Sequence, residues 1–124
     1  MIRTFLDLQV KPEHAEALIS LFKAQGVLDQ SVAQPGCHSA ELSVSDDGLA
    51  VTVTAVWDSV AAYDTWTARD DRASLSELIN RHLAVPVTAT TTGRVHRVEI
   101  RRVAPGRDAT DEPADRRDHQ GDAP

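Results

Sequence analysis

Aromatic side chains that could hold a ligand are concentrated in VWDSVAAYDTW, residues 56–66 of the chain. Trp57, Tyr63 and Trp66 are the only tryptophans and the only tyrosine in the protein. Their flat rings can enclose an aromatic molecule, and a buried tyrosine hydroxyl needs a hydrogen-bond partner that a ligand can supply. The same rings can also anchor a small core, which is the main role we expect for Trp57.

Two histidines are candidates for taking up a proton near neutral pH. His38 shares an alternating pattern with Leu42, and His82 shares a helical stripe with Leu78 and Ile79. If both imidazoles face one cavity, they can accept a proton from a bound substrate. The alternative interpretation is that each is a core histidine with a backbone or carboxylate partner.

Metal and phosphate chemistry has no supporting motif in the sequence. No two histidines stand four residues apart, no HxH or HExxH occurs, and no glycine-rich phosphate loop is present. The lone Cys37 excludes an internal disulfide and a cysteine-based zinc cluster. Composition leaves a Ser-His-Asp arrangement open, but no Gly-x-Ser-x-Gly motif supports one. We therefore expect no metal at the site.

Charge and composition narrow the class of protein. The net charge of −6 argues against a nucleic-acid partner, and the hydrophobic fraction of 41% predicts a folded domain. No apolar run is long enough to cross a membrane and no signal peptide is evident, so we expect a cytoplasmic protein. Residues 104–124 contain no Val, Ile, Leu or aromatic residue, which predicts a disordered acidic tail after a domain over residues 1–103.

Alternating and helical patterns predict the elements that position these residues, in the order β-α-β-β-α-β. Alternation on both sides of an Asp-Gly turn gives the clearest unit, a hairpin. Asp58 or Ser59 can cap the helix that follows it. The predicted strands are 2–10, 37–45, 49–57 and 87–103 (the last with a possible kink at Gly93), and the helical segments are 13–25, 27–34, 60–67 and 72–84.

This order is that of an α+β, ferredoxin-like domain with one antiparallel sheet and helices on one face. The opposite face of the sheet carries a mixture of apolar, polar and arginine side chains that is poorly suited to solvent alone. A second copy of the chain packed sheet to sheet would cover it. We therefore expect a twofold homodimer, because twofold symmetry is the commonest form of homo-oligomer.

The same stretch of sequence resembles a known family. Pro-Gly, a strand, an acidic turn, a strand ending in Trp-Asp-Ser and then Ala-Tyr follow one another at Pro35-Gly36, Asp46-Asp47-Gly48, Trp57-Asp58-Ser59 and Ala62-Tyr63. This succession resembles the antibiotic biosynthesis monooxygenase (ABM) family of the dimeric α+β barrel superfamily. The resemblance covers about residues 1–103 and is closest to the small oxygenases that convert phenolic polyketide intermediates to quinones.

The resemblance implies an oxidoreductase that uses O₂ without a metal or flavin, on a small aromatic substrate held between helices and sheet. Val53 stands where the quinone-forming members carry an asparagine. Trp66 matches the helix tryptophan of the heme-degrading relatives, and Ser76 stands where their histidine would be. Heme is the weaker cofactor alternative, and a non-oxidative ligand-binding or cyclase-type protein is the alternative function.

Together these arguments give a set of candidate site residues. Arg72 has two interpretations, of which we favour a surface ion pair with Asp70 or Asp71 over a clamp for substrate. Phe22 belongs to the apolar face of the first helix. The expected catalytic residues are His82, Trp66 and His38, and the expected substrate-binding residues are Tyr63, Trp57, Val53, Arg72 and Phe22.

Overall fold

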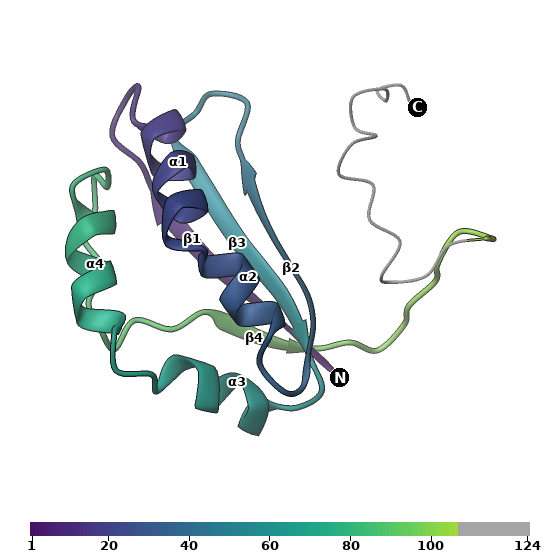
Figure 1. Ribbon diagram of the computed structural model, residues 1–124. Helices are drawn as coiled ribbons and strands as arrows, with labels where there is room; N and C mark the ends of the chain where they lie inside the picture. The colour runs from purple at the N-terminus through teal and green to yellow at the C-terminus, as the bar shows by residue number, and fades with distance from the viewer. Residues whose placement is uncertain (107–124) are drawn as a thin grey trace.

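The computed structural model describes residues 1–106 as one sheet with helices packed on it (Figure 1). At each of the two helical positions in the predicted β-α-β-β-α-β order, the structure has two short helices. The strands are β1 (Ile2–Gln9), β2 (Cys37–Val44), β3 (Ala50–Trp57) and β4 (Arg94–Arg97), and the helices are α1 (Ala15–Gln25), α2 (Val27–Val32), α3 (Val60–Thr67) and α4 (Arg72–Asn80).

The four strands form a single sheet in the order β2-β3-β1-β4, and every neighbouring pair is antiparallel. The central pair, β1 and β3, is in register along its whole length, with Leu8 opposite Val51 and Thr4 opposite Ala55. The predicted α+β, ferredoxin-like fold is confirmed.

Two groups of buried side chains join the inner face of the sheet to the helices. The larger one contains Leu8 and Val51 from the sheet, Leu18 from α1 and Ile79 from α4. The smaller one surrounds Trp57, the last residue of β3, and includes Tyr63 of α3. Because α1, α3 and α4 all pack on this face, a ligand between sheet and helices would contact both layers.

Local polar contacts stabilise the hairpin turn and the start of α3. The hairpin turn is held by Asp47, whose carboxylate accepts hydrogen bonds from the hydroxyl of Ser45 (2.7 Å) and the N–H of Leu49 (2.9 Å). Ser59, rather than Asp58, caps α3 by accepting the N–H of Ala62 at 3.2 Å. Both turns were predicted from the sequence.

Two predicted elements are shorter than expected. The strand predicted over 87–103 is limited to β4, because the threonine-rich residues 88–91 close a turn of their own and only residues 94–97 pair with β1. The helix predicted over 72–84 ends at Asn80, and Leu83 instead forms a bridge with Val10 beside β1. The part of the predicted tail at residues 107–124 lies outside the described residues.

The outer face of the sheet carries a polar network. Asp7 of β1 accepts a hydrogen bond from Thr52 (3.0 Å) and forms an ion pair with Arg94 of β4 (3.0 Å). The Arg94 guanidinium also lies 4.8 Å from the ring centre of Phe5. These contacts connect β3, β1 and β4 on the outer face and include an aromatic ring.

Candidate functional site

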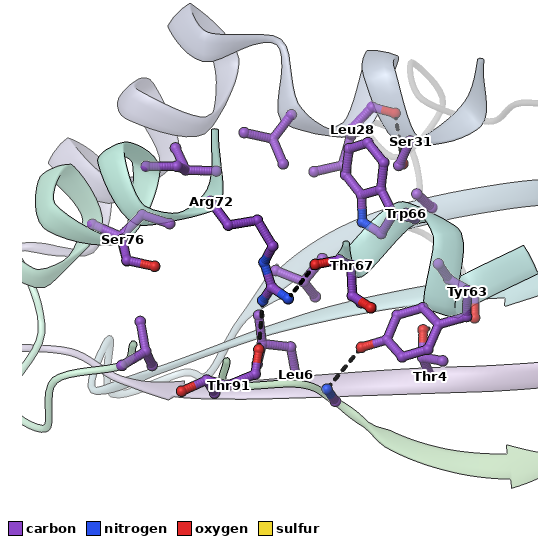
Figure 2. Close-up of a pocket in the computed structure, with 18 of the residues that line it drawn as sticks. Thr4, Leu6, Leu28, Ser31, Tyr63, Trp66, Thr67, Arg72, Ser76 and Thr91 are labelled. Atoms are coloured by element: carbon purple, nitrogen blue, oxygen red, sulfur yellow. Dashed lines mark hydrogen bonds between the residues drawn. The ribbon is translucent and has the colours of Figure 1, made fainter. Parts of the chain in front are cut away.

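A pocket lies between the inner face of the sheet and the helices (Figure 2). Its walls come from β1, β2 and β3, from all four helices, and from the segment between α4 and β4. Its lining includes Phe22, Val53, Trp57, Tyr63, Trp66, Arg69, Arg72, Ser76, Val87, Thr91 and Gly93. The pocket thus gathers six of the eight candidates from the sequence and leaves out His38 and His82.

The aromatic stretch forms one side of this pocket. The ring centres of Trp57 and Tyr63 are 5.7 Å apart, and those of Trp57 and Trp66 are 6.4 Å apart. Trp57 is 1% exposed, as expected for a core anchor, yet it also lines the pocket. Its Nε1–H is buried and has no hydrogen-bond partner among the described residues. An unmatched buried donor of this kind is costly unless a ligand oxygen accepts it.

The hydroxyl of Tyr63 is held in place by the main chain. It accepts a hydrogen bond from the N–H of Gly93 at 2.7 Å (Figure 2). A phenol oxygen that accepts in this way still has its own proton to donate. Gly93 is needed for this approach, because a Cβ there would lie 2.8 Å from the carbonyl oxygen of Phe5 and 3.1 Å from the Tyr63 hydroxyl.

Arg72 turns into the pocket instead of pairing with a neighbouring carboxylate. Its guanidinium donates to the carbonyl oxygens of Thr67 at the end of α3 (3.0 Å) and of Thr91 (Figure 2). The favoured prediction of an ion pair between Arg72 and Asp70 or Asp71 is wrong. Asp71 binds the Nε of Arg69 at 2.7 Å, since the break between α3 and α4 points these two side chains toward each other.

Arg69 is a pocket residue that the sequence argument missed. Its guanidinium carbon lies 3.7 Å from the ring centre of Trp66, a cation–π contact. The available signal was spacing, because Arg69 follows Trp66 by three residues, the separation at which helical neighbours meet. Burial, and next the charge of Arg69, lowers the pKa of Arg72.

A further wall of the pocket is the segment from Val87 to Gly93, between α4 and β4. Asn80, the last residue of α4, clamps its start, donating to the Val87 carbonyl (2.7 Å) and accepting the Val87 N–H (2.8 Å). Thr88 and Thr91 close a turn within it, with an N–H to carbonyl hydrogen bond of 3.1 Å. The wall is therefore ordered by its own hydrogen bonds although it contains no helix or strand.

The remaining polar groups of the pocket offer no strong proton acceptor. Thr4, Ser31 and Thr67 each donate the hydroxyl proton to a main-chain carbonyl. Within residues 1–106, the lining contains no Asp, Glu, His or Cys, and its only charged side chains are Arg69 and Arg72. Chemically the site can bind and stabilise an anion formed on a substrate, but it carries no side chain suited to act as a general base.

The expectation that His38 faces this cavity is not met. An irregularity in the pairing of β2 with β3 falls between Cys37 and Ser39, which shifts the alternation at that point. His38 is consequently turned outward, with its side chain 40% exposed, and its Nε2 lies 2.6 Å from a carboxylate oxygen of Asp58. It belongs to a surface hydrogen bond with Asp58.

His82 also lies outside the pocket, because α4 ends two residues before it. Its Nδ1 is 3.0 Å from the Nδ1 of His14, so one ring donates a proton to the other. The main chain fixes this arrangement through a hydrogen bond from the Lys11 N–H to the His82 carbonyl (3.0 Å). The pair fastens the end of α4 to the turn before α1.

Acid is expected to destabilise the protein through this histidine pair. Partial burial, and then the nearby His14, Lys11 and Arg81, lower the pKa of His82 from 6.5. The unfolded chain therefore binds a proton more readily than the folded one, and stability falls as the pH drops below about 6.5. Urea unfolding at pH 7.5 and pH 5.5 should show a smaller loss in His82→Gln than in the wild type. An equal loss in both would contradict this assignment.

Metal and heme sites find little support in the described part of the chain. No group of three or more His, Cys, Asp or Glu side chains gathers there in a way that could hold a metal ion. The pocket, as far as residues 1–106 define it, presents no imidazole, thiolate or thioether as an axial ligand for heme iron. Its donor set does not fit a heme.

Comparison with known proteins agrees with the fold. The sequence profile described as antibiotic biosynthesis monooxygenase matches residues 1–75, more than half of the chain. The chain belongs to this family. The match to the ABM family ends within α4, so it includes the strands β1 to β3 and the aromatic stretch.

Solved structures extend the likeness beyond those residues. A monooxygenase from the ActVA-Orf6 gene of Streptomyces coelicolor, in complex with the ligand nanaomycin D, is 26% identical, with 82% of this chain and 88% of that chain covered and a TM-score of 0.61. Rv0793 from Mycobacterium tuberculosis is 19% identical (83% and 97% covered, TM-score 0.60). A conserved protein from Methanosarcina mazei Go1 is 18% identical (79% and 92% covered, TM-score 0.63). The last two likenesses show the fold alone.

Two further findings concern this ABM domain. No curated protein matches the sequence. Among the described residues, no helix is both long enough and apolar enough to span a bilayer.

Proposed function

We propose that the protein is a cofactor-independent monooxygenase that oxidises a small, electron-rich aromatic with O₂ in the pocket between sheet and helices. The observation that carries the proposal is the chemistry of the pocket lining: hydrogen-bond donors and positive charge around aromatic walls, with no acidic or imidazole side chain among the described lining residues. Such a lining favours the deprotonated form of a phenol or anthrone, which is the form that can reduce O₂ directly.

Two neutral donors are proposed to bind the oxygen atom of the substrate on which negative charge develops. Tyr63 has a hydroxyl proton to donate because its oxygen already accepts from Gly93, and Trp57 has a buried Nε1–H that no group within residues 1–106 accepts. Fixed donors in a dry site stabilise an anion more strongly than water does, since they need no reorganisation. The substrate proton passes to water, because no lining side chain is suited to take it.

The overall reaction balances without a further reductant. The substrate loses two hydrogens, both from the CH₂ carbon of an anthrone, or one from a ring carbon and one from the hydroxyl of a phenol. That carbon gains a carbonyl oxygen from O₂ in a four-electron oxidation, and the other oxygen atom leaves as water with the two hydrogens. One quinone is formed for each O₂ consumed. The ring walls of Trp57 and Trp66 orient the aromatic plane, and Val53 and Phe22 supply apolar contact on its other sides. The proposal is also consistent with the family and with the Streptomyces coelicolor structure, which is described as a monooxygenase in complex with nanaomycin D.

Oxygen uptake tests this proposal. With anthrones or dihydroxynaphthalenes in metal-free buffer containing EDTA, the wild type should consume O₂ well above the uncatalysed rate and release one quinone per O₂. His82→Gln, which alters a histidine outside the pocket, should keep the wild-type rate. Uptake that never exceeds the background, or that EDTA abolishes, would overturn the proposal. Tight binding without uptake would favour the non-oxidative, ligand-binding or cyclase-type alternative.

We also propose that the protein is a homodimer formed through the outer face of the sheet. Support comes from the aromatic ring of Phe5, which lies on that face beside Arg94 and His96 of β4, and from two apolar side chains exposed in the segment after β4, Ile100 and Val103. Apolar side chains exposed in this way are typical of surfaces that bind another protein. A sedimentation mass near 13.5 kDa, the mass of one chain, would contradict this proposal.

A further inference from the structure

Two guanidinium groups line the same pocket, at the junction of α3 and α4. Arg69 stacks on Trp66, and Arg72 reaches across to the wall at Thr91. Arg69 lies in the break between the helices and Arg72 is the first residue of α4, so this end of the pocket carries two positive charges. The rest of the lining is mainly apolar and aromatic. The pocket is therefore divided into a charged end and an apolar body.

The charge at this end is not balanced by the described part of the protein. Arg72 forms no ion pair within residues 1–106, and the two carbonyl oxygens that it contacts are neutral. Asp71 binds only the Nε of Arg69 and is itself 59% exposed at its side chain, so water screens its charge. Within residues 1–106, only the Nε of the Arg69 guanidinium donates a hydrogen bond, so both of its terminal nitrogens have protons for a ligand.

Physical chemistry predicts what would occupy such an end. A partly buried cation without a counter-ion is unfavourable, and a second cation nearby adds repulsion. An anionic ligand relieves both effects. Guanidinium groups bind carboxylates with paired, charge-assisted hydrogen bonds, which are stronger than bonds between neutral groups.

From this juxtaposition we infer that the substrate carries a carboxylate, which Arg69 and Arg72 bind at the α3–α4 junction while its aromatic rings occupy the apolar body of the pocket. The inference rests on the proposed function in that it assumes the same pocket and an aromatic ligand. It adds a substrate class, aromatic acids, and assigns the two arginines a role in specificity. The carboxylate is a permanent charge and is separate from the oxygen atom that Tyr63 and Trp57 are proposed to bind.

Binding of matched acids and esters tests this inference without any turnover. Calorimetry would give dissociation constants for 1-hydroxy-2-naphthoic acid and anthraquinone-2-carboxylic acid, each against its methyl ester. Since both tryptophans of the chain line the pocket, quenching of their fluorescence would report that the ligand binds there. The acids should bind at least about tenfold more tightly than the esters at low ionic strength, and added salt should reduce this preference.

Variants separate recognition of charge from a structural role. Arg69→Gln and Arg72→Gln should each lower the acid-to-ester preference several-fold, whereas Arg72→Lys should keep part of it, because lysine retains the charge but not the paired hydrogen bonds. Arg81→Gln, an exposed arginine outside the pocket lining, is the matched control and should leave it unchanged. If Arg72 served only to join Thr67 to Thr91, its loss would weaken acid and ester equally.

Three results would overturn the inference: no binding of either acid, equal binding of acid and ester, or an unchanged preference in both glutamine variants. These results are distinguishable from failure of the proposed function. A clear preference for acids without O₂ uptake would support the carboxylate site and overturn the oxygenase. O₂ uptake with neutral phenols and no preference for acids would do the opposite.

Discussion

Tyr63→Phe is expected to lower kcat for O₂-dependent oxidation by about 10²-fold, the effect of removing one donor from an oxyanion site. The hydroxyl is fixed by the Gly93 N–H at 2.7 Å and can direct its proton only toward another acceptor, such as a substrate oxygen. The ring remains against Trp57, so substrate affinity should change little. Oxygen-electrode measurements of kcat and KM would show this split.

Stability measurements control for the structural part of this change. Without the hydroxyl, the Gly93 N–H loses its partner, which should cost about 1–2 kcal/mol of unfolding free energy. Thr65→Ala, an exposed change on the same helix, should leave kcat unchanged. Trp57→Phe removes the other proposed donor and should reduce kcat by a similar factor. If kcat of Tyr63→Phe stays within twofold of the wild type, the hydroxyl has no part in the reaction.

Gly93→Ala is expected to destabilise the fold by about 1–3 kcal/mol, the usual cost of inserting a group where no space exists. The new methyl group would lie 2.8 Å from the Phe5 carbonyl oxygen, a main-chain atom that cannot rotate away. The start of β4 would have to move off β1, and the Gly93 N–H would move off Tyr63. Activity should therefore fall together with stability.

Urea unfolding and kcat measured on the same preparations would check this pair of effects. Thr92→Ala changes the exposed neighbouring residue and is the matched control, for which both quantities should stay near wild type. A Gly93→Ala variant with wild-type stability would mean that β1 and β4 separate at little cost. The close approach at Gly93 would then have no influence on the site.

The fold was predictable because its strongest signals are local. Alternation on both sides of the Asp47-Gly48 turn, and the capping residue Ser59, depend on neighbours a few residues apart. The ends of elements were harder to predict when distant contacts set them. β4 is short because residues 88–91 form their own turn, and α4 stops early because Leu83 bridges to Val10.

The site was predictable in its aromatic half and not in its polar half. Trp57, Tyr63 and Trp66 lie where their spacing places them, on the side of α3 and β3 that faces the pocket. His38 is displaced by a single irregularity in β2, a feature that alternation cannot reveal. His82 leaves the pocket because the helix that would have carried it ends first.

The two arginines show a different limit of sequence reasoning. Arg69 and Arg72 are equally close to the acidic residues Asp70 and Asp71 along the chain, and proximity alone does not decide which pairs form. The geometry of the break between α3 and α4 determines the pairing: Asp71 forms an ion pair with Arg69, and Arg72 points into the pocket. Side-chain directions at a helix junction depend on the geometry of the junction itself.

The wall from Val87 to Gly93 has a consequence for how this domain can change over time. It follows the residues that match the family profile, which end at 75, and it is fastened at one end by Asn80 and at the other by β4. Between those anchors, residues 88–92 carry no strand pairing, so their number and their side chains can vary without disturbing the sheet, whereas Gly93 at the end of the wall cannot. Related proteins could thus share one sheet and helix framework and bind new substrates through changes in this wall alone.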